Sequence, residues 1–404
     1  MTQDRRATTQ TRWWGGRLSI GLLAVLPLAI LGLLIWVFIA FNPIATLVGD
    51  VPAIPEVAID RVELNDAGIV AHVTNAGPAR TTVAQVLIDD AYWSFQISPS
   101  ATIPRLGSAT VTIPYPWVQN EPHELKLITD DGTTFTHEIE LATASPQPDL
   151  NFWLLFAAIG IYVGVVPVGL GLAWFPLLRR LSRRGMDFIL ALTVGLLVFL
   201  LVDTALEGVE FARRVPDVFQ AIPLVALAGF LSFLVLVIVN RQGSRGDTGS
   251  RGGRLWLATS IAIGIGLHNL GEGMAIGAAI SLGEVGLGAF LVIGFTLHNV
   301  TEGVGIGAPM SRDNPGLSRI LVLIALAGVP AIVGTWIGGF AFSPLLAVVF
   351  LAIGAGAILQ VIYEVSKLLL DRAAAASASG LNWVNLGGLT AGILIMYVTA
   401  FLVA

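Results

Sequence analysis

Long apolar runs separated by short polar segments make up most of the chain, and one polar stretch near the N-terminus interrupts this pattern. A helix needs about 20 apolar residues to cross the hydrocarbon core of a membrane. Runs of this kind predict nine spanning helices, at Leu18–Phe41, Phe152–Leu178, Met186–Phe211, Ala221–Asn240, Leu255–Ile280, Val285–Met310, Ile320–Phe340, Pro344–Leu370 and Trp383–Val403. The composition agrees, because 55% of the residues are hydrophobic and 12% are charged, against about 25% charged in typical soluble domains.

Charge balance and cysteine content narrow the function further. A net charge of −5 offers no basic footprint for a polyanion, which argues against nucleic-acid binding. So few charges also argue against a cytosolic globular enzyme. The absence of cysteine excludes disulfides and thiolate metal ligands. We therefore expect a protein whose main solvent and partner is the lipid bilayer.

The first apolar run needs a separate interpretation, because Arg5, Arg6, Arg12 and Arg17 precede it as cations precede a secretory signal. Its apolar core is longer than the roughly 7–15 residues of such a signal, and no clear small-x-small cleavage site follows. We therefore favour a retained anchor helix.

The positions of the cations predict the orientation. Most of the 22 lysines and arginines fall on one side if the N-terminus lies in the cytoplasm and the nine spans alternate. Cytoplasmic loops are enriched in such residues. The distribution predicts a multi-pass protein of the cell (plasma) membrane, with a cytoplasmic N-terminus, an outer C-terminus and residues 42–150 outside.

Residues 42–150 have the pattern of a small β domain. Alternating or β-rich runs such as Gly68–Val73, Thr82–Ile88 and Ala109–Ile113 are punctuated by turn-forming residues, which predicts a β-sandwich. Its histidines are interpreted as surface or edge residues and not as metal ligands: His72, His123 and His137. The chain then divides into a tail and anchor (1–41), this outer domain (42–150) and a helical domain (151–404).

Two of the predicted spans contain the same polar pattern. Gly264–Ala278 and Gly294–Ala308 share the sequence H-N-x-x-E-G-x-x-I-G-A. Residues four apart lie on one face of a helix, so each copy presents a His–Glu pair beside an asparagine. The pairs and their asparagines are His268, Asn269 and Glu272 in the first copy, and His298, Asn299 and Glu302 in the second.

Ionisable residues inside a membrane are functional candidates, because they are costly unless paired or hydrated. Two imidazoles and two carboxylates brought together would form a nitrogen and oxygen ligand set that suits Zn²⁺, Fe²⁺ or Mn²⁺. The alternative is a pair of His–Glu hydrogen bonds that only hold helices together. The duplication of the motif favours the metal site.

Other acidic residues within the spans suggest a path through the membrane. Asp203, Glu207 and Glu210 follow one face of the third span towards its outer end, and Glu364 lies near the inner surface. Glu207 and Glu210 have an alternative role as partners of the arginines at 213–214. The first interpretation places an acidic mouth outside, the His/Glu centre in the middle and a carboxylate at the inner exit.

The doubled motif resembles the H-N-x-P-E-G-type sequences of the ZIP (Zrt/Irt-like) family of divalent-metal transporters. The resemblance covers about Leu150–Ala404 and implies a membrane all-α fold of eight helices in a 3 + 2 + 3 arrangement, here preceded by the anchor helix and the sandwich-like all-β outer domain. It implies a principal metal site, with two asparagines serving this metal or an adjacent one: His268, Glu272, His298 and Glu302, with Asn269 and Asn299. The acidic positions of the family's second and seventh helices match Asp203 and Glu364.

The resemblance further implies a function. The family moves Zn²⁺, Fe²⁺, Mn²⁺ and similar ions into the cytoplasm by alternating access, commonly as homodimers. We expect the metal ion to be the transported substrate, with Zn²⁺ as the first candidate, and we expect no prosthetic group.

The chain departs from the family pattern at several places. Gly271 and Thr301 replace the motif prolines, so any helix kink must come from glycine or from hydroxyl bonding to the backbone. The sixth helix of the resemblance contains Gly328–Ala331 with no carboxylate, which argues against a binuclear centre. The loop Arg241–Arg254 has no histidine cluster, and the first 150 residues lie outside the resemblance.

Two other functions use the same ligands. An intramembrane metalloenzyme is disfavoured because H-E-x-x-H is absent, and because di-iron bundles use Glu-x-x-His, the reverse order. A metal sensor or receptor, whose outer domain binds a partner, is the third possibility. We expect a transporter and not an enzyme.

Overall fold

The computed structural model describes residues 17–41, 54–243, 250–375, 379–380 and 382–403. Contacts divide the chain into two compact units, Met1–Ile54 and Pro55–Ala404. The first unit contains helix α1 (Arg17–Phe41), and the second contains every described strand and the remaining helices. The predicted division at residues 150 and 151 falls inside the second unit and stays a prediction.

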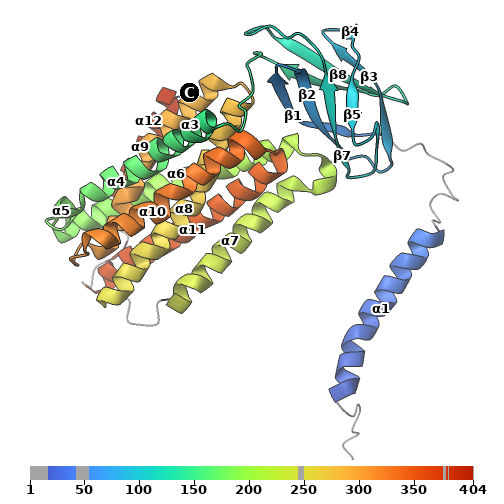
Figure 1. Cartoon of the computed structure of the whole chain (residues 1–404). Coiled ribbons are helices and arrows are strands. Elements are labelled where there is room, and N and C mark those ends of the chain that lie inside the picture. Colours follow the sequence, from blue (N-terminus) through green and yellow to red (C-terminus); the bar gives the residue numbers. More distant parts are fainter. Residues whose placement is uncertain (1–16, 42–53, 244–249, 376–378, 381, 404) are drawn as a thin grey trace, which may run out of the picture. The chain divides into compact units, whose positions relative to one another are not determined.

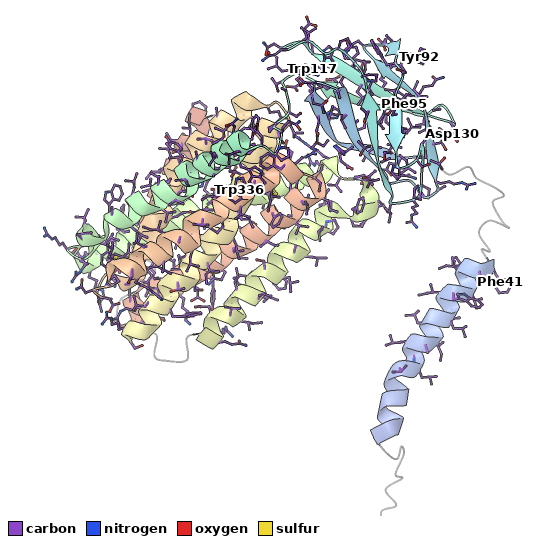
Figure 2. All side chains as sticks on the ribbon, viewed as in Figure 1. Phe41, Tyr92, Phe95, Trp117, Asp130 and Trp336 are labelled. Carbon is purple, nitrogen blue, oxygen red and sulfur yellow. The ribbon has the colours of Figure 1, made fainter. Side chains whose placement is uncertain are left out.

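Helix α1 coincides with the first predicted span. Its side chains from Val25 to Phe41 are all exposed, including the labelled Phe41 in Figure 2. A helix that is apolar all round is stable in lipid, where its surface needs no polar face. Its role as an anchor stays a prediction.

Residues 57–139 form two antiparallel sheets, which agrees with the predicted β domain. One sheet has the order β1-β2-β7-β5 and the other β4-β3-β8-β9, with β6 paired to β3. The strands are β1 (Val57–Asn65), β2 (Gly68–Asn75), β3 (Thr81–Ile88), β4 (Ala91–Tyr92), β5 (Gln96–Ser98), β6 (Thr102–Ile103), β7 (Ser108–Ile113), β8 (His123–Thr129) and β9 (Thr134–Ile139). Ile69 and Val111 of the first sheet share one buried apolar core with Val86 and Leu125 of the second.

The interpretation of His123 as a surface or edge histidine is wrong. Its side chain is 3% exposed, and its Nδ1 lies 2.8 Å from Oδ2 of Asp89. The ring of Tyr115 packs edge-on against it, with the ring centres 5.2 Å apart. A polar ring can be buried when a carboxylate pairs with it, and strand alternation alone does not reveal such a partner. His72 and His137 are partly exposed, as expected.

Figure 1 shows the helices after the β domain running side by side in a bundle. Within the described residues, seven helical segments are long and apolar enough to cross a membrane, so the protein has the character of a multi-pass membrane protein. Helix α8 has the length but is not one of these seven segments. The elements are α3 (Leu150–Gly160), the π turn η1 (Ile161–Val165), α4 (Val166–Ala173), α5 (Phe175–Leu178), α6 (Arg183–Arg214), η2 (Asp217–Phe219), α7 (Ala221–Gly243), α8 (Arg251–Ser281), α9 (Val285–Gly307), η3 (Ala308–Met310), α10 (Leu317–Ala341), α11 (Pro344–Ala374) and α12 (Trp383–Val403).

Capping side chains fix where four of these helices begin. Asp149 accepts a hydrogen bond from the backbone N–H of Phe152 at the start of α3. Ser182, Ser250 and Ser343 do the same for α6, α8 and α11. Each cap satisfies one of the N–H groups that a helix start leaves without a partner.

Glycines bring the two motif helices into direct backbone contact with their neighbours. A Cβ added at Gly273 on α8 would clash with the carbonyl oxygen of Ala331 on α10. A Cβ added at Gly303 on α9 would clash with the carbonyl oxygen of Val168 on α4. The glycine that follows each motif glutamate therefore has the same role, close helix approach, in both copies.

Glycines also join α6 to α12 and α7 to α11. Gly195 lies against the backbone of Leu389, and Gly356 against that of Gly229. By contrast, α8 meets α11 largely through side chains, such as Val361 and Gln360 beside Gly264. The bundle thus contains helix pairs in close backbone contact and other pairs, such as α8 and α11, that meet largely through side chains.

Aromatic side chains collect at the end of the bundle where α3 begins. The Nε1–H of Trp336, labelled in Figure 2, donates to the carbonyl oxygen of Trp153 at 3.0 Å, and Phe340 packs against the Trp153 ring. Tryptophan is favoured at membrane–water interfaces because its ring is apolar and its N–H is polar. This end therefore has the composition of an interface.

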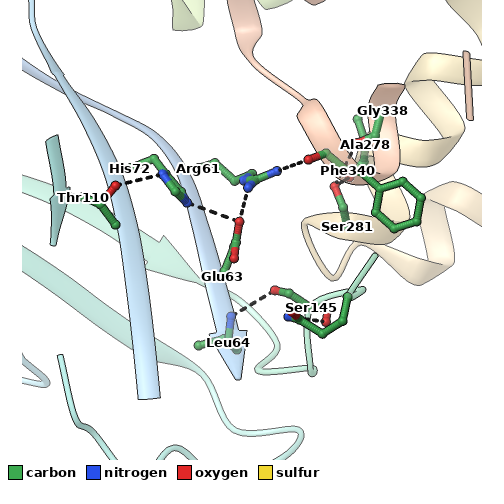
Figure 3. A network of polar contacts seen from close by, with 11 residues as sticks. Arg61, Glu63, Leu64, His72, Thr110, Ser145, Ala278, Ser281, Gly338 and Phe340 are labelled. Carbon is green, nitrogen blue, oxygen red and sulfur yellow. Dashed lines mark hydrogen bonds and ion pairs between the residues drawn. The ribbon is translucent and has the colours of Figure 1, made fainter. Parts of the chain in front are cut away.

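One polar network on the β domain reaches the same end of α10 (Figure 3). Arg61 donates to the carbonyl oxygen of Phe340 at 3.1 Å and also pairs with Glu63. His72 donates to Glu63 at 3.2 Å and accepts from Thr110. The hydrogen bond from His72, together with the nearby Arg61 charge, holds the pKa of Glu63 below its usual range against the opposing effect of burial.

We expect Gly273→Ala to destabilise the protein by about 1–3 kcal/mol, because the added methyl group must push α8 away from α10. Thermal unfolding in detergent measures the effect. Gly286→Ala is the matched control, since its added Cβ meets nothing within 4 Å. Equal melting temperatures for the two variants would contradict this account of the packing.

Candidate metal site

The two motif copies lie on α8 and α9, and the structure buries all six motif side chains. Three of them form the one group of potential metal ligands found among the described residues: His268, Glu272 and His298. Their ligand atoms all lie within 4.8 Å of one another. The helical spacing and the pairing of the two copies that we predicted therefore bring these three side chains together.

The carboxylate of Glu272 links both histidines. His268 donates from Nε2 to Glu272 Oε1 at 2.9 Å, and His298 donates to the same oxygen at 2.6 Å. The second carboxylate oxygen accepts from Nδ2 of Asn299 at 3.2 Å. Both copies of the motif thus meet on one carboxylate group.

Four buried oxygen atoms at the motif have no hydrogen-bond donor among the described residues. They are both carboxylate oxygens of Glu302 and the Oδ1 atoms of Asn269 and Asn299. Buried acceptors without a donor are costly, by about 1–3 kcal/mol each. All four are of the type that coordinates a divalent cation. These oxygens are therefore buried without the hydrogen-bond donors or the cation that would stabilise them.

The asparagines fix the motif helices to their neighbours. Asn269 donates from Nδ2 to the carbonyl oxygen of Ala327 on α10 at 3.0 Å. Asn299 donates to the carbonyl oxygen of Val163 in the π turn η1, also at 3.0 Å. A π turn alters the directions of backbone carbonyls and is frequent at functional sites. This bond uses the amide N–H group and leaves the amide oxygen available.

Thr301 replaces a motif proline, and its hydroxyl donates to the carbonyl oxygen of His298 at 2.6 Å. Hydroxyl bonding to the backbone is one of the two substitutes for proline that we expected. The bond lies within the turn that positions the His298 ring.

The predicted path residues on α6 share a cavity with the site. A cavity of about 460 Å³ reaches His298 and is lined by four acidic residues, and we call it the acidic cavity: Asp203, Glu207, Glu210 and Glu284. The alternative role as an arginine partner applies to Glu210, which pairs with Arg214 at 3.3 Å.

Glu284 was not among the sequence candidates. It precedes α9 in a short turn, where a charged residue is expected whether or not it has a function. The fold places this turn beside α6 and so adds Glu284 to the acidic cavity. Periodicity could not identify it, because the residue belongs to no predicted helix.

The last path residue, Glu364, lies elsewhere. It lines a cavity of about 640 Å³ that contains none of the six motif residues. Because six cations line it, we call it the basic cavity: Arg183, Arg241, Arg254, Arg312, Lys367 and Arg372. Glu364 is therefore not brought to the His/Glu centre.

Buried apolar residues separate the centre from the basic cavity. On α8, Ile261 and Ile265 lie between the cavity-lining Arg254 and His268, and on α11 Val361 lies just before Glu364. One polar pair joins α8 and α11 beside these apolar residues: Nε2 of Gln360 donates to the hydroxyl of Ser260 at 3.2 Å.

Gln360 was not among the sequence candidates either. It is fully buried, and its Oε1 has no donor among the described residues. The available signal was its place in a predicted span, four residues before Glu364.

No family model matches the chain, and no curated protein matches it either. The resemblance to the ZIP family therefore rests on the motifs themselves and stays a prediction.

We expect the purified protein to bind Zn²⁺ and Glu272→Gln to weaken that binding by more than about 10-fold, since the variant removes the charge that both histidines share. Calorimetric titration measures the affinity. Glu138→Gln on β9 is the control, because this residue lies outside the acidic cavity and the motif. Unchanged affinity in Glu272→Gln would exclude this group as the binding site.

Proposed function

We propose that the chain is a divalent-metal transporter that takes up an ion such as Zn²⁺, Fe²⁺ or Mn²⁺ through the centre formed by His268, Glu272 and His298. The observation that supports this proposal most directly is the set of buried acceptor oxygens without donors beside these three side chains. A divalent cation satisfies such acceptors. A purely structural hydrogen-bond network would supply donors to them instead.

The two cavities support transport as against simple binding. The acidic cavity reaches His298, while the basic cavity is separated from the centre by buried apolar side chains. A site that is open towards one end of a bundle and closed towards the other has the form expected of one state in alternating access. In this proposal the closed end opens where helices meet through side chains, as α8 and α11 do.

The direction of transport follows from the predicted orientation. The acidic cavity lies at the end of the bundle where α6 ends and α9 begins, which is also the end at which α3 follows the β domain. The cation distribution predicts that this end faces outward. An acidic surface there concentrates cations before they enter.

We expect vesicles containing the protein to take up Zn²⁺, Fe²⁺ or Mn²⁺, and His298→Ala combined with Glu302→Ala to abolish uptake, because the pair removes two of the proposed ligands. Uptake is measured with a metal-sensitive dye enclosed in the vesicles. His137→Ala on β9 is the matched histidine control and is expected to keep full activity.

Two results would contradict the proposal. Uptake unchanged in a correctly folded double variant would show that the site is assigned wrongly. Stoichiometric metal binding without any flux would favour the sensor or the metalloenzyme, which use the same ligands without moving the ion.

We expect Glu284→Gln to raise the KM for uptake several-fold with little change in kcat, because this residue attracts the ion to the acidic cavity without binding it in the centre. The effect should shrink at high salt, which screens exposed charges. Asp217→Asn, an acidic change near the same end but outside the cavity lining, is the control. Equal effects of both variants would remove any special role for Glu284.

A further inference from the structure

The basic cavity is a second feature that the proposed function does not explain. It lies at the end of the bundle where α6 and α8 begin and where α7 and α11 end. Its six cations come from all four of these helices and from the segment after α9, and its two lining carboxylates are Glu364 and Asp371. The transport of a cation does not by itself explain why six cationic side chains line this cavity.

Nearby acids neutralise only part of this charge. Arg254 pairs with Asp313 through two hydrogen bonds of 2.6 and 2.8 Å, which hold the pKa of that carboxyl below its usual range. Arg372 pairs with Asp187 at 2.7 Å, and Arg183 lies 3.8 Å from the other oxygen of the same carboxylate. Within the described part of the chain, no ion pair links a carboxylate to the remaining cations on α7, after α9 and on α11: Arg241, Arg312 and Lys367.

The general enrichment of cations at cytoplasmic membrane ends does not account for this arrangement. That enrichment requires only that positive residues lie near the helix ends. Several arginines at these ends meet this requirement and do not line the cavity: Arg179, Arg180, Arg184, Arg251 and Arg319. The enrichment does not require six other cations to line one cavity. Like charges around one cavity repel each other, so their convergence is unfavourable without an anion.

The first turn of α8 adds to the positive field. Gly253 and Arg254 belong to that turn and line the cavity. The N-terminus of a helix carries about half a positive charge, which favours an anion. The backbone N–H groups of Gly253 and Arg254 are bonded to Ser250, so the contribution of this turn is its dipole. The guanidinium groups match phosphate oxygens in a forked geometry.

We propose that the basic cavity binds a phosphate-bearing anion, either a free phosphorylated small molecule or the headgroup of an anionic lipid. The volume of about 640 Å³ exceeds the needs of a single phosphate group and lies within the range of small-molecule sites. Trp256 and Tyr363 in the lining offer apolar surface to the rest of such a ligand. The overall net charge of −5, which argues against polyanion binding by the whole chain, conceals this local concentration.

The test uses the full-length protein in nanodiscs of zwitterionic lipid, with pyrophosphate as the probe at constant ionic strength. We expect saturable binding by calorimetry, and Arg312→Gln combined with Lys367→Gln to weaken it at least tenfold. Arg180→Gln combined with Arg184→Gln is the control, because it removes the same charge from the same end outside the cavity. Melting temperatures establish that the variants fold, and the single variants replace the pair if it does not.

A second arm distinguishes the two sources of phosphate. Nanodiscs containing phosphatidic acid are examined by native mass spectrometry, and the lipid retained by each variant is counted. Pyrophosphate binding without retained lipid supports a free anion, and lipid that displaces pyrophosphate supports a headgroup. Absence of both, or equal loss in the cavity and control variants, would overturn the proposal. None of these readouts depends on metal transport, so the two proposals can fail separately.

Discussion

The carboxylate of Glu272 is the point on which the arrangement of the site depends. It is buried, and it accepts hydrogen bonds from His268, His298 and Asn299, so it holds residues of both motif helices together. A buried carboxylate is stable when its oxygens are satisfied in this way. Because both histidines use Nε2 to bind it, a metal ion must compete with the Glu272 hydrogen bonds before it can bind those nitrogens.

Each copy of the repeated motif packs its helix against a neighbouring helix, and both copies contribute side chains to one site. His298 of the second copy binds Glu272 of the first, while in each copy the asparagine and the glycine after the glutamate contact an outer neighbour. Asn269 and Gly273 contact α10, where Pro330 interrupts the regular hydrogen-bond pattern, and Asn299 and Gly303 contact η1 and α4. The order of residues therefore encodes helix packing and ligand position together. This also explains why the spacing of the two copies is the same although their neighbours differ.

Much of the fold and of the centre could be predicted from the sequence because both depend on regular spacing. Apolar length identifies spanning helices, and the i, i+4 relation puts His268 and Glu272 on one face. The rest depends on which segments meet in space. The turn containing Glu284, the buried pairing of His123 with Asp89 and the π turn beside Asn299 have no periodic signal of their own. Glu302 and Glu364 show the limit most clearly. A helix position does not predict that the oxygens of Glu302 lack hydrogen-bond donors, or that six cations line the cavity of Glu364.

The opposite charges of the two cavities bear on how an ion would leave the protein. The acidic cavity lowers the energy of a cation near His298, whereas the cations of the basic cavity raise it near Glu364. Opening the apolar layer at Ile261, Ile265 and Val361 would therefore not suffice for release, because the ion would move towards positive charge. A bound anion would reverse that gradient and leave Glu364 as an attractive exit ligand. The two proposals can be tested separately, yet together they make release conditional on the charge of a second ligand.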